Sequence, residues 1–264
     1  MTLVLTILGC GSSGGVPRIG GDWGLCDPTN PKNRRRRCSI LLEKTEGSGT
    51  TRMLIDTSPD LREQMLSENV SAIDGVWFTH EHADHTHGID ELRGFFLRQR
   101  SRVPIWADRQ TMTMLTNRFA YCFQTFAGGD YPPTLLPNLI EAGHEVKTTG
   151  AGGTISAMPF LVNHGNLDVL GFRFGNTAYT PDLNGIPEGS APYLSNLDLW
   201  IVDALKRDPH GSHFCLEQTL QAIERFRPRR AVLTNMHIDM DYDTLRAELP
   251  GGVEPAYDGQ KLHL

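Results

Sequence analysis

The sequence predicts a mixed α/β protein in which strands and helices alternate along the whole chain. Short apolar, β-branched segments recur from one end to the other, as expected for buried strands. Amphipathic segments with helix-start and helix-stop residues lie between many of them. Of the 264 residues, 39% are hydrophobic and 21% are charged, a composition typical of a globular core. Because both element types interleave through both halves, we expect one domain, residues 1–264.

The first half is expected to start with a strand at 2–9 that runs into Gly9-Cys-Gly-Ser-Ser-Gly14. These letters match a dinucleotide-binding loop, but more loop follows instead of a helix, which argues against that interpretation. Ser58-Pro59 is a favourable start for a helix. Residues 120–150 are predicted to be irregular and are the best candidate for an insertion over a site. The other expected elements are a hairpin (38–43 and 51–57), a helix from 58 to about 68, a strand at 75–79, a helix at 90–97, a strand at 104–107 and a helix at 110–119.

The second half is expected to hold a strand at 154–162 and a hairpin around Gly175-Asn176. A helix that starts near Leu216 should end before Pro228, since proline cannot continue it. The remaining expected elements are strands at 169–174, 177–180, 198–204 and 231–236, a short helix at 243–249 and a final strand near the C-terminus.

Composition argues against several functional classes. The net charge of −6 gives no electrostatic case for a nucleic-acid partner. No run of 18 apolar residues exists, so no membrane partner is expected, and the N-terminus lacks the basic start of a signal peptide. The five cysteines are scattered without a Cys-x-x-Cys pair, which fits a reducing compartment, so we expect the cytoplasm. Four arginines at 34–37 could hold phosphate or form a solvated face, and both interpretations stay open.

The densest cluster of chemical side chains follows the predicted strand at 75–79. His80, His82, Asp84 and His85 fall within six positions. His80 and His82 alternate by two, so an extended segment directs both imidazoles to one side. Asp84 and His85 come after a turn and can face a second point. Four ligand-type residues this close indicate two metals that share a site.

Three more ligand-type residues each follow an apolar strand: His164, Asp182 and His237. Together with Asp56 and the cluster at 80–85, they appear in the order of the five sequence blocks of the metallo-β-lactamase superfamily. The chain therefore resembles that superfamily. The resemblance implies a four-layer αββα sandwich, two mixed β-sheets flanked by helices, with the site on loops at one edge.

The resemblance also implies a role for each ligand-type residue. His80, His82 and His164 would hold one metal, and Asp84, His85 and His237 the other. Asp182 would bridge both, and Asp56 would orient the metal loop. Imidazoles and carboxylates suit zinc or manganese, and also iron. Two such ions about 3.5–4 Å apart can hold a bridging water and lower its pKa, so the expected nucleophile is a metal-bridging hydroxide.

Other segments resemble the phosphoribosyl 1,2-cyclic phosphate phosphodiesterases within that superfamily. They are the loop at 8–18, Cys26-Asp-Pro with the stretch 33–39, and the region 203–214. By resemblance His213 would act on the substrate phosphate, with Asp84 and Asp182 as catalytic carboxylates. Candidate phosphate contacts are Ser12, Ser13, Arg18 and Ser212. Because only Cys26 occupies the early loop and Met240 stands where a histidine is usual, we expect no structural zinc.

The expected substrate is a small cyclic phosphate or a nucleotide-like phosphodiester, and a homodimer is compatible with the resemblance. A tRNA 3′-processing endonuclease would need a flexible basic arm that the sequence does not show. A glyoxalase II-like thioester hydrolase would need a basic C-terminal helical extension. A non-catalytic, metal-dependent nucleotide-binding protein is the alternative outside the enzymes, although all seven ligand-type residues are present.

Overall fold

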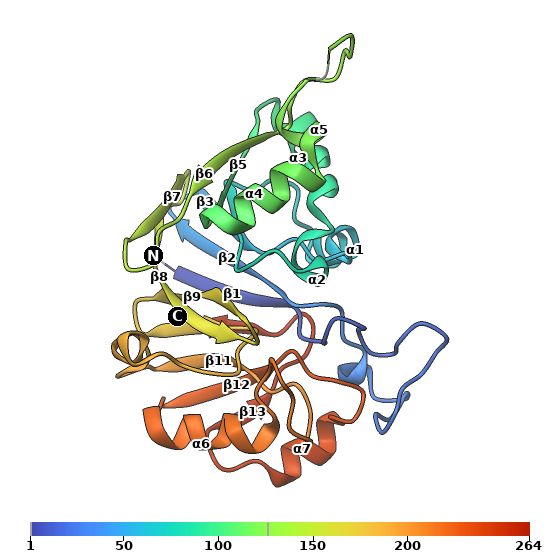
Figure 1. The fold of residues 1–264 in the computed structure, drawn as a ribbon, viewed down its shortest axis with the longest axis vertical. Coiled ribbons are helices and arrows are strands. Elements are labelled where there is room, and N and C mark those ends of the chain that lie inside the picture. The colour runs from blue at the N-terminus through green and yellow to red at the C-terminus, as the bar shows by residue number, and fades with distance from the viewer. Residues whose placement is uncertain (1, 126) are drawn as a thin grey trace. The chain divides into compact units, whose positions relative to one another are not determined.

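The computed structural model describes residues 2–125 and 127–264, which form two compact units (Figure 1). Unit 1 comprises Met1–Thr6, Ser39–Ser156 and Lys261–Leu264. Unit 2 comprises Ile7–Cys38 and Ala157–Gln260. The single domain expected from the sequence stays a prediction, which one cooperative unfolding transition in calorimetry would confirm.

The first sheet has seven strands in the order β14-β1-β2-β3-β4-β5-β6. Its strands are β1 (Thr2–Gly9), β2 (Ser39–Glu46), β3 (Gly49–Ile55), β4 (Gly75–Trp77), β5 (Val103–Ala107), β6 (Leu135–Leu139) and β14 (Lys261–His263). β2 and β3 form an antiparallel hairpin, whereas β3, β4, β5 and β6 run parallel. The sheet is therefore mixed, and its parallel part brings the carboxyl ends of β3 and β4 to one edge.

The helices of unit 1 connect these strands. They are α1 (Leu61–Ser67), α2 (Ala83–Thr86), the 3₁₀ turn η2 (Ile89–Glu91), α3 (Leu92–Gln99), α4 (Arg109–Arg118) and α5 (Ala120–Phe123). α4 begins after Asp108, whose side chain accepts a hydrogen bond from the backbone N–H of Thr111 at 2.7 Å. Leu92, Phe95, Met112 and Leu115 are buried on α3 and α4, so both helices cover apolar surface.

The second sheet also has seven strands, in the order β13-β12-β11-β10-β9-β8-β7. Its strands are β7 (Val146–Gly150), β8 (Gly153–His164), β9 (Leu167–Phe174), β10 (Thr177–Thr180), β11 (Leu199–Asp203), β12 (Arg230–Thr234) and β13 (Val253–Pro255). β10 and β11 are buried at every position. Such continuous burial is typical of parallel strands covered on both faces.

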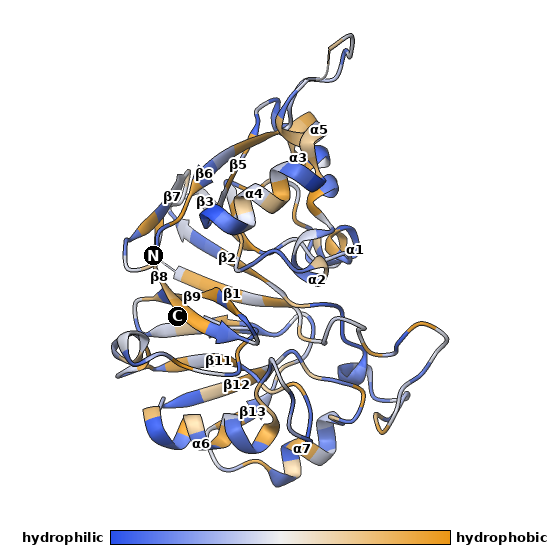
Figure 2. Cartoon of the chain, in the orientation of Figure 1, coloured by the Kyte–Doolittle hydropathy of each residue, from blue (hydrophilic) through white to orange (hydrophobic). Residues whose placement is uncertain are grey.

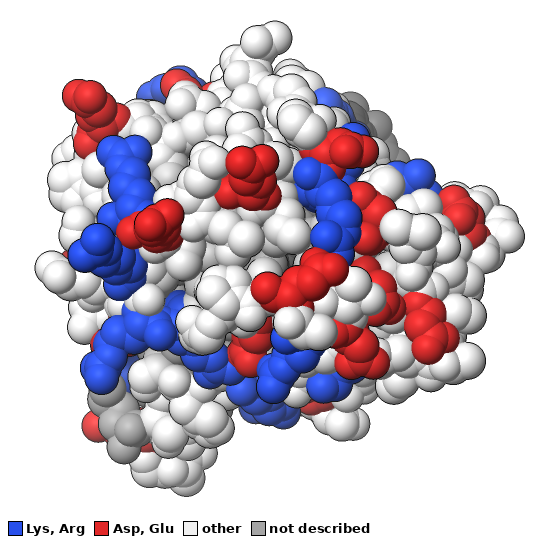
Figure 3. Space-filling model, turned by 90° about the horizontal axis from the view of Figure 1, so that it is seen from below, with Lys and Arg blue, Asp and Glu red and all other residues white. Residues whose placement is uncertain are grey.

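Helical segments of unit 2 are η1 (Pro31–Asn33), η3 (Glu188–Leu194), α6 (Leu216–Phe226) and α7 (Tyr242–Glu248). Figure 2 shows hydrophobic and hydrophilic residues alternating along α6, the pattern of an amphipathic helix. α6 ends at Phe226, two residues before Pro228, as expected from the sequence. Figure 3 shows basic and acidic side chains next to one another on the face that it presents.

Strand direction in unit 2 determines where the polar strand ends meet. β10, β11 and β12 run parallel, and β8 points the same way because β9 is antiparallel to both β8 and β10. β8 ends at His164 and β11 ends at Asp203. Asp182 is the second residue after β10, and Asn235 is the first residue after β12. Side chains at the carboxyl ends of parallel strands gather at one sheet edge.

Two expectations from the sequence were wrong. Residues 120–150 are not irregular, because α5, β6 and β7 lie there. β6 buries only Leu135, and β7 buries Thr148 beside Val146, so neither strand shows a strong apolar pattern. α1 starts at Leu61 rather than at Ser58-Pro59, since Ser58 donates its hydroxyl to the Gln64 side chain at 2.9 Å instead of capping the helix. The position of 120–150 over a site stays a prediction.

Among the described residues, no helix is both long and apolar enough to cross a membrane.

Candidate functional site

The histidine cluster of unit 1 lies on the segment that leaves β4 and enters α2. His80 and His82 lie in the extended part, with ring centroids 4.6 Å apart. Asp84 and His85, which the sequence placed after a turn, lie on the short helix α2. The His80 and His85 rings lie 4.3 Å apart between centroids. A change from extended to helical backbone within four residues therefore brings all three rings together.

Asp56 holds the two ends of this segment. Its carboxylate accepts hydrogen bonds from the backbone N–H and the hydroxyl of Thr79, both at 2.8 Å. The other end is held through Nδ1 of His85, also at 2.8 Å. Burial raises the pKa of Asp56, while the bonds from His85 and Thr79 oppose that shift. Asp56 itself has a left-handed backbone (φ 63°), an uncommon conformation for a non-glycine residue that often accompanies functional sites.

One donor pair of unit 1 has the spacing of ligands on a single cation. Nε2 of His85 lies 3.5 Å from Oδ2 of Asp84. Two atoms about 2.1 Å from a tetrahedral cation lie about 3.4 Å from each other. Nδ1 of His85 is occupied by Asp56, so the tautomer with Nε2 as the ligand atom is favoured.

The same spacing occurs independently in unit 2. Nε2 of His164, the last residue of β8, lies 3.6 Å from Oδ2 of Asp182. Nδ1 of His164 donates to the backbone carbonyl of Ser212 at 2.6 Å, which again directs Nε2 toward the carboxylate. Both residues are buried. The imidazole–carboxylate chemistry and the spacing of both pairs fit zinc, manganese or iron.

His213 forms a dyad with Asp203 in unit 2. Nδ1 of His213 donates to Oδ2 of Asp203 at 2.8 Å, and Leu183 N–H donates to the same oxygen at 3.1 Å. Burial raises the pKa of Asp203 to about 7, although the bond from His213 favours the ionised carboxylate. Asn235, with a left-handed backbone (φ 60°), donates to Asp182 Oδ1 at 3.2 Å. Nδ2 of Asn235 also lies 3.2 Å from Nδ1 of His213, so one amide lies between the dyad and the Asp182 carboxylate.

His237 has different partners. Its Nδ1 lies 2.9 Å from Oδ1 of Asp239, and its Nε2 contacts the guanidinium of Arg18. The backbone N–H of His237 donates to the carbonyl of Leu205 at 2.8 Å. The structure therefore places the nitrogen expected to bind a metal against a cationic side chain.

The other residues expected to contact phosphate differ in exposure. Ser12 is buried, its backbone N–H donates to the Met236 carbonyl at 3.1 Å, and its hydroxyl has no hydrogen-bond partner in the described part of the chain. Ser13 is exposed. Ser212 contributes its carbonyl to His164. Gly11 has no room for a side chain, because a Cβ there would lie 2.9 Å from the Cβ of Arg35.

Sequence reasoning did not assign roles to Asp203, Asn235 and Asp239. Asp203 and Asn235 share one signal, since each is a polar residue at or next to the end of a buried strand. Nothing local marks Asp239, which is recognised only through its contact with His237.

The four arginines at 34–37 do not form a common solvated face. The guanidinium of Arg34 lies over the Trp23 ring, 5.4 Å from its centroid. Arg36 pairs with Asp258 through Nε at 3.0 Å. Arg35 is buried. The interpretation as a solvated face was therefore wrong for Arg35, whose contacts are described below.

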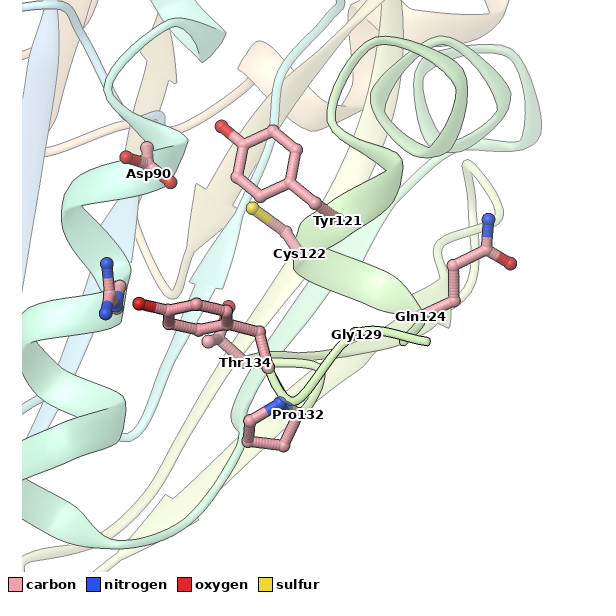
Figure 4. A pocket seen from close by; sticks show the side chains of 9 residues that line it. Asp90, Tyr121, Cys122, Gln124, Gly129, Pro132 and Thr134 are labelled. Carbon is pink, nitrogen blue, oxygen red and sulfur yellow. The ribbon is translucent and has the colours of Figure 1, made fainter. Parts of the chain in front are cut away.

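Unit 1 also contains a cavity of about 320 Å³ beside α3 and α5 (Figure 4). Asp90, Tyr121 and Cys122 point toward one another, whereas Gln124 points away from them. Tyr131 lies under the guanidinium of Arg93, 5.0 Å from it. Burial, with Cys122 and Asp90 nearby, raises the pKa of Tyr121 to about 12. Tyr121 and Tyr131, two aromatics of the segment 120–150, thus line one cavity.

Comparison with known proteins identifies the family. The model of the β-lactamase superfamily domain matches residues 51–238. A curated protein of Porphyromonas gingivalis (strain ATCC BAA-308 / W83), named octanoyltransferase, is 30% identical over 256 residues, 96% of this chain and 50% of that protein. This chain thus spans about half the length of that relative.

Solved structures show the fold. A diphosphatase from the PhnP family is 32% identical, with a TM-score of 0.88 over 99% of this chain and 98% of that chain. Zn²⁺-bound PqqB from Methylobacterium extorquens is 18% identical, with a TM-score of 0.75 over 99% of this chain and 100% of that one. The human short-form tRNase Z is also 18% identical, with a TM-score of 0.64 over 98% of both chains.

The likeness to the PhnP-family structure confirms the predicted fold class, two mixed sheets flanked by helices. The predicted resemblance to this superfamily and its metal-dependent hydrolases is confirmed at the level of the family. With the family model covering most of its length, this chain belongs to the β-lactamase superfamily and has the fold of that superfamily's metal-dependent hydrolases.

Proposed function

We propose that the protein is a metal-dependent phosphodiesterase that binds two divalent cations, zinc or manganese, with iron as a further candidate. The observation that carries this proposal is the repeated donor spacing. In unit 1, Nε2 of His85 lies 3.5 Å from Oδ2 of Asp84. In unit 2, Nε2 of His164 lies 3.6 Å from Oδ2 of Asp182. Each spacing suits two ligands of one cation.

The proposed ligand set follows the superfamily pattern. His80, His82 and His164 would hold one cation, Asp84, His85 and His237 would hold the other, and Asp182 would contribute to both. When bound, such a pair of cations supplies a hydroxide nucleophile at neutral pH and neutralises charge on the phosphoryl oxygens. Asp56 orients the ligands at 80–85 through its hydrogen bonds with Thr79 and His85.

His213 is the proposed proton donor to the leaving oxygen. Its Nδ1–H is held by Asp203 at 2.8 Å, so the ring has one orientation and presents Nε2 on the opposite side. The Asp203 carboxylate stabilises the imidazolium that can donate from Nε2. The dyad, with Asp203 buried and His213 partly exposed, thus supplies the proton that the departing alkoxide oxygen needs.

Arg18 and Ser12 are the proposed phosphate contacts with the strongest support. Arg18 and a cation would compete for Nε2 of His237, since both cannot occupy the same side of the ring. With His237 as a metal ligand, the guanidinium of Arg18 would be free of that ring, and a guanidinium pairs well with phosphate oxygens. The buried Ser12 hydroxyl lacks a protein partner in the described chain and can donate to a phosphoryl oxygen.

The proposed substrate is a small cyclic phosphate or a nucleotide-like diester, with no need for a nucleic-acid partner. Support comes from the resemblance of the loop at 8–18 to cyclic phosphate phosphodiesterases. A second candidate is cleavage of a diphosphate linkage, favoured by the PhnP-family diphosphatase at 32% identity over nearly the whole chain. Both reactions attack phosphorus, so one ligand set serves either.

The test is metal content per chain of the purified protein, measured together with substrate turnover. Chelated protein would be reloaded with zinc or manganese and assayed on a chromogenic phosphodiester, a cyclic nucleotide and a nucleoside diphosphate ester. We expect two ions per chain and turnover only when they are present. His82→Ala should lose both ion and turnover.

Other results would contradict the proposal in distinct ways. Two ions with turnover of a thioester, but of no phosphorus ester, would indicate a glyoxalase II-like hydrolase. Cleavage of precursor tRNA alone would indicate a processing nuclease. Nucleotide binding that persists in inactive wild-type protein with two ions would indicate a non-catalytic binding protein.

A further inference from the structure

Arg35 is a charged side chain buried at 2% exposure, and no carboxylate pairs with it in the described part of the chain. Its guanidinium instead faces neutral acceptors. Nη2 donates to the Met240 carbonyl at 2.7 Å and to Oδ1 of Asn33 at 3.3 Å. Nη1 lies 3.5 Å from the His237 carbonyl and 3.8 Å from Sγ of Cys26. A lone buried charge is costly, so these hydrogen bonds must offset its desolvation.

The acceptors of Arg35 lie on one short turn. The carbonyls of His237 and Met240 both face its guanidinium, and Leu25 N–H donates to the carbonyl between them, that of Ile238, at 2.8 Å. The side chain of Asn33 contacts the residues that follow this turn. It accepts a hydrogen bond from the N–H of Tyr242 at 2.8 Å and donates one to the carboxylate of Asp241 at 2.6 Å. The early loop thus satisfies the backbone carbonyls of the turn that carries His237.

We infer that Arg35 is a positioning residue that fixes the backbone of His237 and so directs its imidazole. The inference rests on the proposed role of His237 as a metal ligand. A planar guanidinium can donate to two carbonyls at once, whereas an ammonium cannot reproduce this fork. Without Arg35, the buried Met240 carbonyl would lose this donor and the His237 carbonyl would keep the N–H of Met240 at 3.1 Å, so the turn would relax. The imidazole would then lose its aligned orientation.

The test compares three variants in full-length protein. Arg35→Met keeps the length of the side chain and removes the donors, and Arg35→Lys keeps the charge without the fork. Arg36→Met is the matched control, since it removes a neighbouring arginine that pairs with Asp258 instead of with the His237 turn. Thermal unfolding and near-ultraviolet circular dichroism report how much of each fold is kept.

The first readout needs no metal. In chelated protein labelled with ¹⁵N at histidine, the His237 ring signals should shift in Arg35→Met and Arg35→Lys and stay unchanged in Arg36→Met. His237→Gln assigns those signals. Unchanged His237 signals in folded Arg35 variants would overturn the inference. If Arg35→Met does not fold, Arg35→Lys provides the same comparison.

The second readout is the affinity for each ion, measured by competition with a chelator. Arg35→Met should lower the affinity for one of the two zinc ions by about 10–100-fold, the range expected when an orienting partner is lost. The affinity for the other ion should stay unchanged. The affinity of Arg35→Lys for that ion should lie between those of wild type and Arg35→Met. Equal weakening of both ions, or the same effect in Arg36→Met, would indicate general destabilisation and overturn the inference. Wild type that binds no zinc would instead refute the proposed function, while the His237 ring signals still test Arg35.

Discussion

The two units carry their ligand-type residues in opposite ways. Unit 1 places His80, His82, Asp84 and His85 on one segment of six residues, where a strand passes into the short helix α2. Unit 2 collects its residues from the ends of separate strands, with His164 on β8, Asp182 after β10 and His237 after β12. Local backbone geometry arranges the first set, whereas sheet topology arranges the second.

This difference shows where each set is vulnerable. In unit 1 one buried carboxylate, Asp56, holds both ends of the segment. In unit 2 each histidine has its own partner, the Ser212 carbonyl for His164, Asp203 for His213 and Asp239 for His237. A single change should therefore disturb several ligands in unit 1, but only one residue at a time in unit 2, unless it removes the bridging ligand.

The largest effect is expected for Asp182→Ala. The proposed bridge contributes to both cations, whose electrostatic stabilisation of the transition state is worth several kcal/mol, so turnover should fall by about a thousandfold or more. Elemental analysis should show fewer than two ions per chain. Turnover and metal content equal to wild type would exclude the two-metal arrangement.

The next largest effect is expected for His213→Ala. Loss of a general acid typically costs about a hundredfold or more in kcat. Metal content should stay at the wild-type value, because the ring contacts Asp203 and is not a proposed ligand. His210→Ala is the control, since that exposed histidine lies in the same loop. Loss of an ion together with turnover would make His213 a metal ligand.

A smaller effect is expected for Asp56→Asn in unit 1. The neutral amide cannot accept from Thr79 and His85 as the carboxylate does, so affinity for the ions should fall by about 10–100-fold. Asp74→Asn is the control, because Asp74 in the same unit accepts from the backbone N–H of Arg52 at 2.8 Å, away from the histidine segment. An equal loss of ion affinity in both variants would show that Asp56 contributes to the stability of the fold and not to the orientation of the ligands.

The smallest effect concerns Asp241, the N-cap of α7 in unit 2. Burial opposes its ionisation, but the N–H groups of Thr244 and Asp27 and the amide of Asn33 lower its pKa from 3.8 to about 2. A lowered folded-state pKa stabilises the fold above the unfolded value, and this stabilisation is lost as pH falls through the folded value. Asp241→Ala should cost about 1 kcal/mol at neutral pH.

Denaturant unfolding from pH 7 down to pH 2 checks this prediction. The difference between wild type and Asp241→Ala should shrink below pH 3.8. Asp108→Ala removes the N-cap of α4 in unit 1 and is the matched control. A difference that is constant over this range would show that the carboxylate charge contributes nothing to the cap.

The sequence by itself determined most of the strands, the helices with strong apolar periodicity and the ordered series of ligand-type residues. Period-two and period-3.6 patterns arise from local backbone geometry, and the segment at 80–85 is one local motif. β6 and β7 escaped prediction because their positions bury few apolar side chains, so packing rather than pattern makes them strands. The start of α1 moved because a side-chain contact between Ser58 and Gln64 replaced the expected cap.

Only the tertiary structure decided the partners of those residues. Asp203 and Asn235 acquired roles through contacts with His213 and Asp182, which lie 10 and 53 residues away in sequence. Arg35 lies 205 residues before the Met240 carbonyl that it binds. Such pairings depend on strand order and burial, which sum over the whole chain, and no local pattern of residues encodes them.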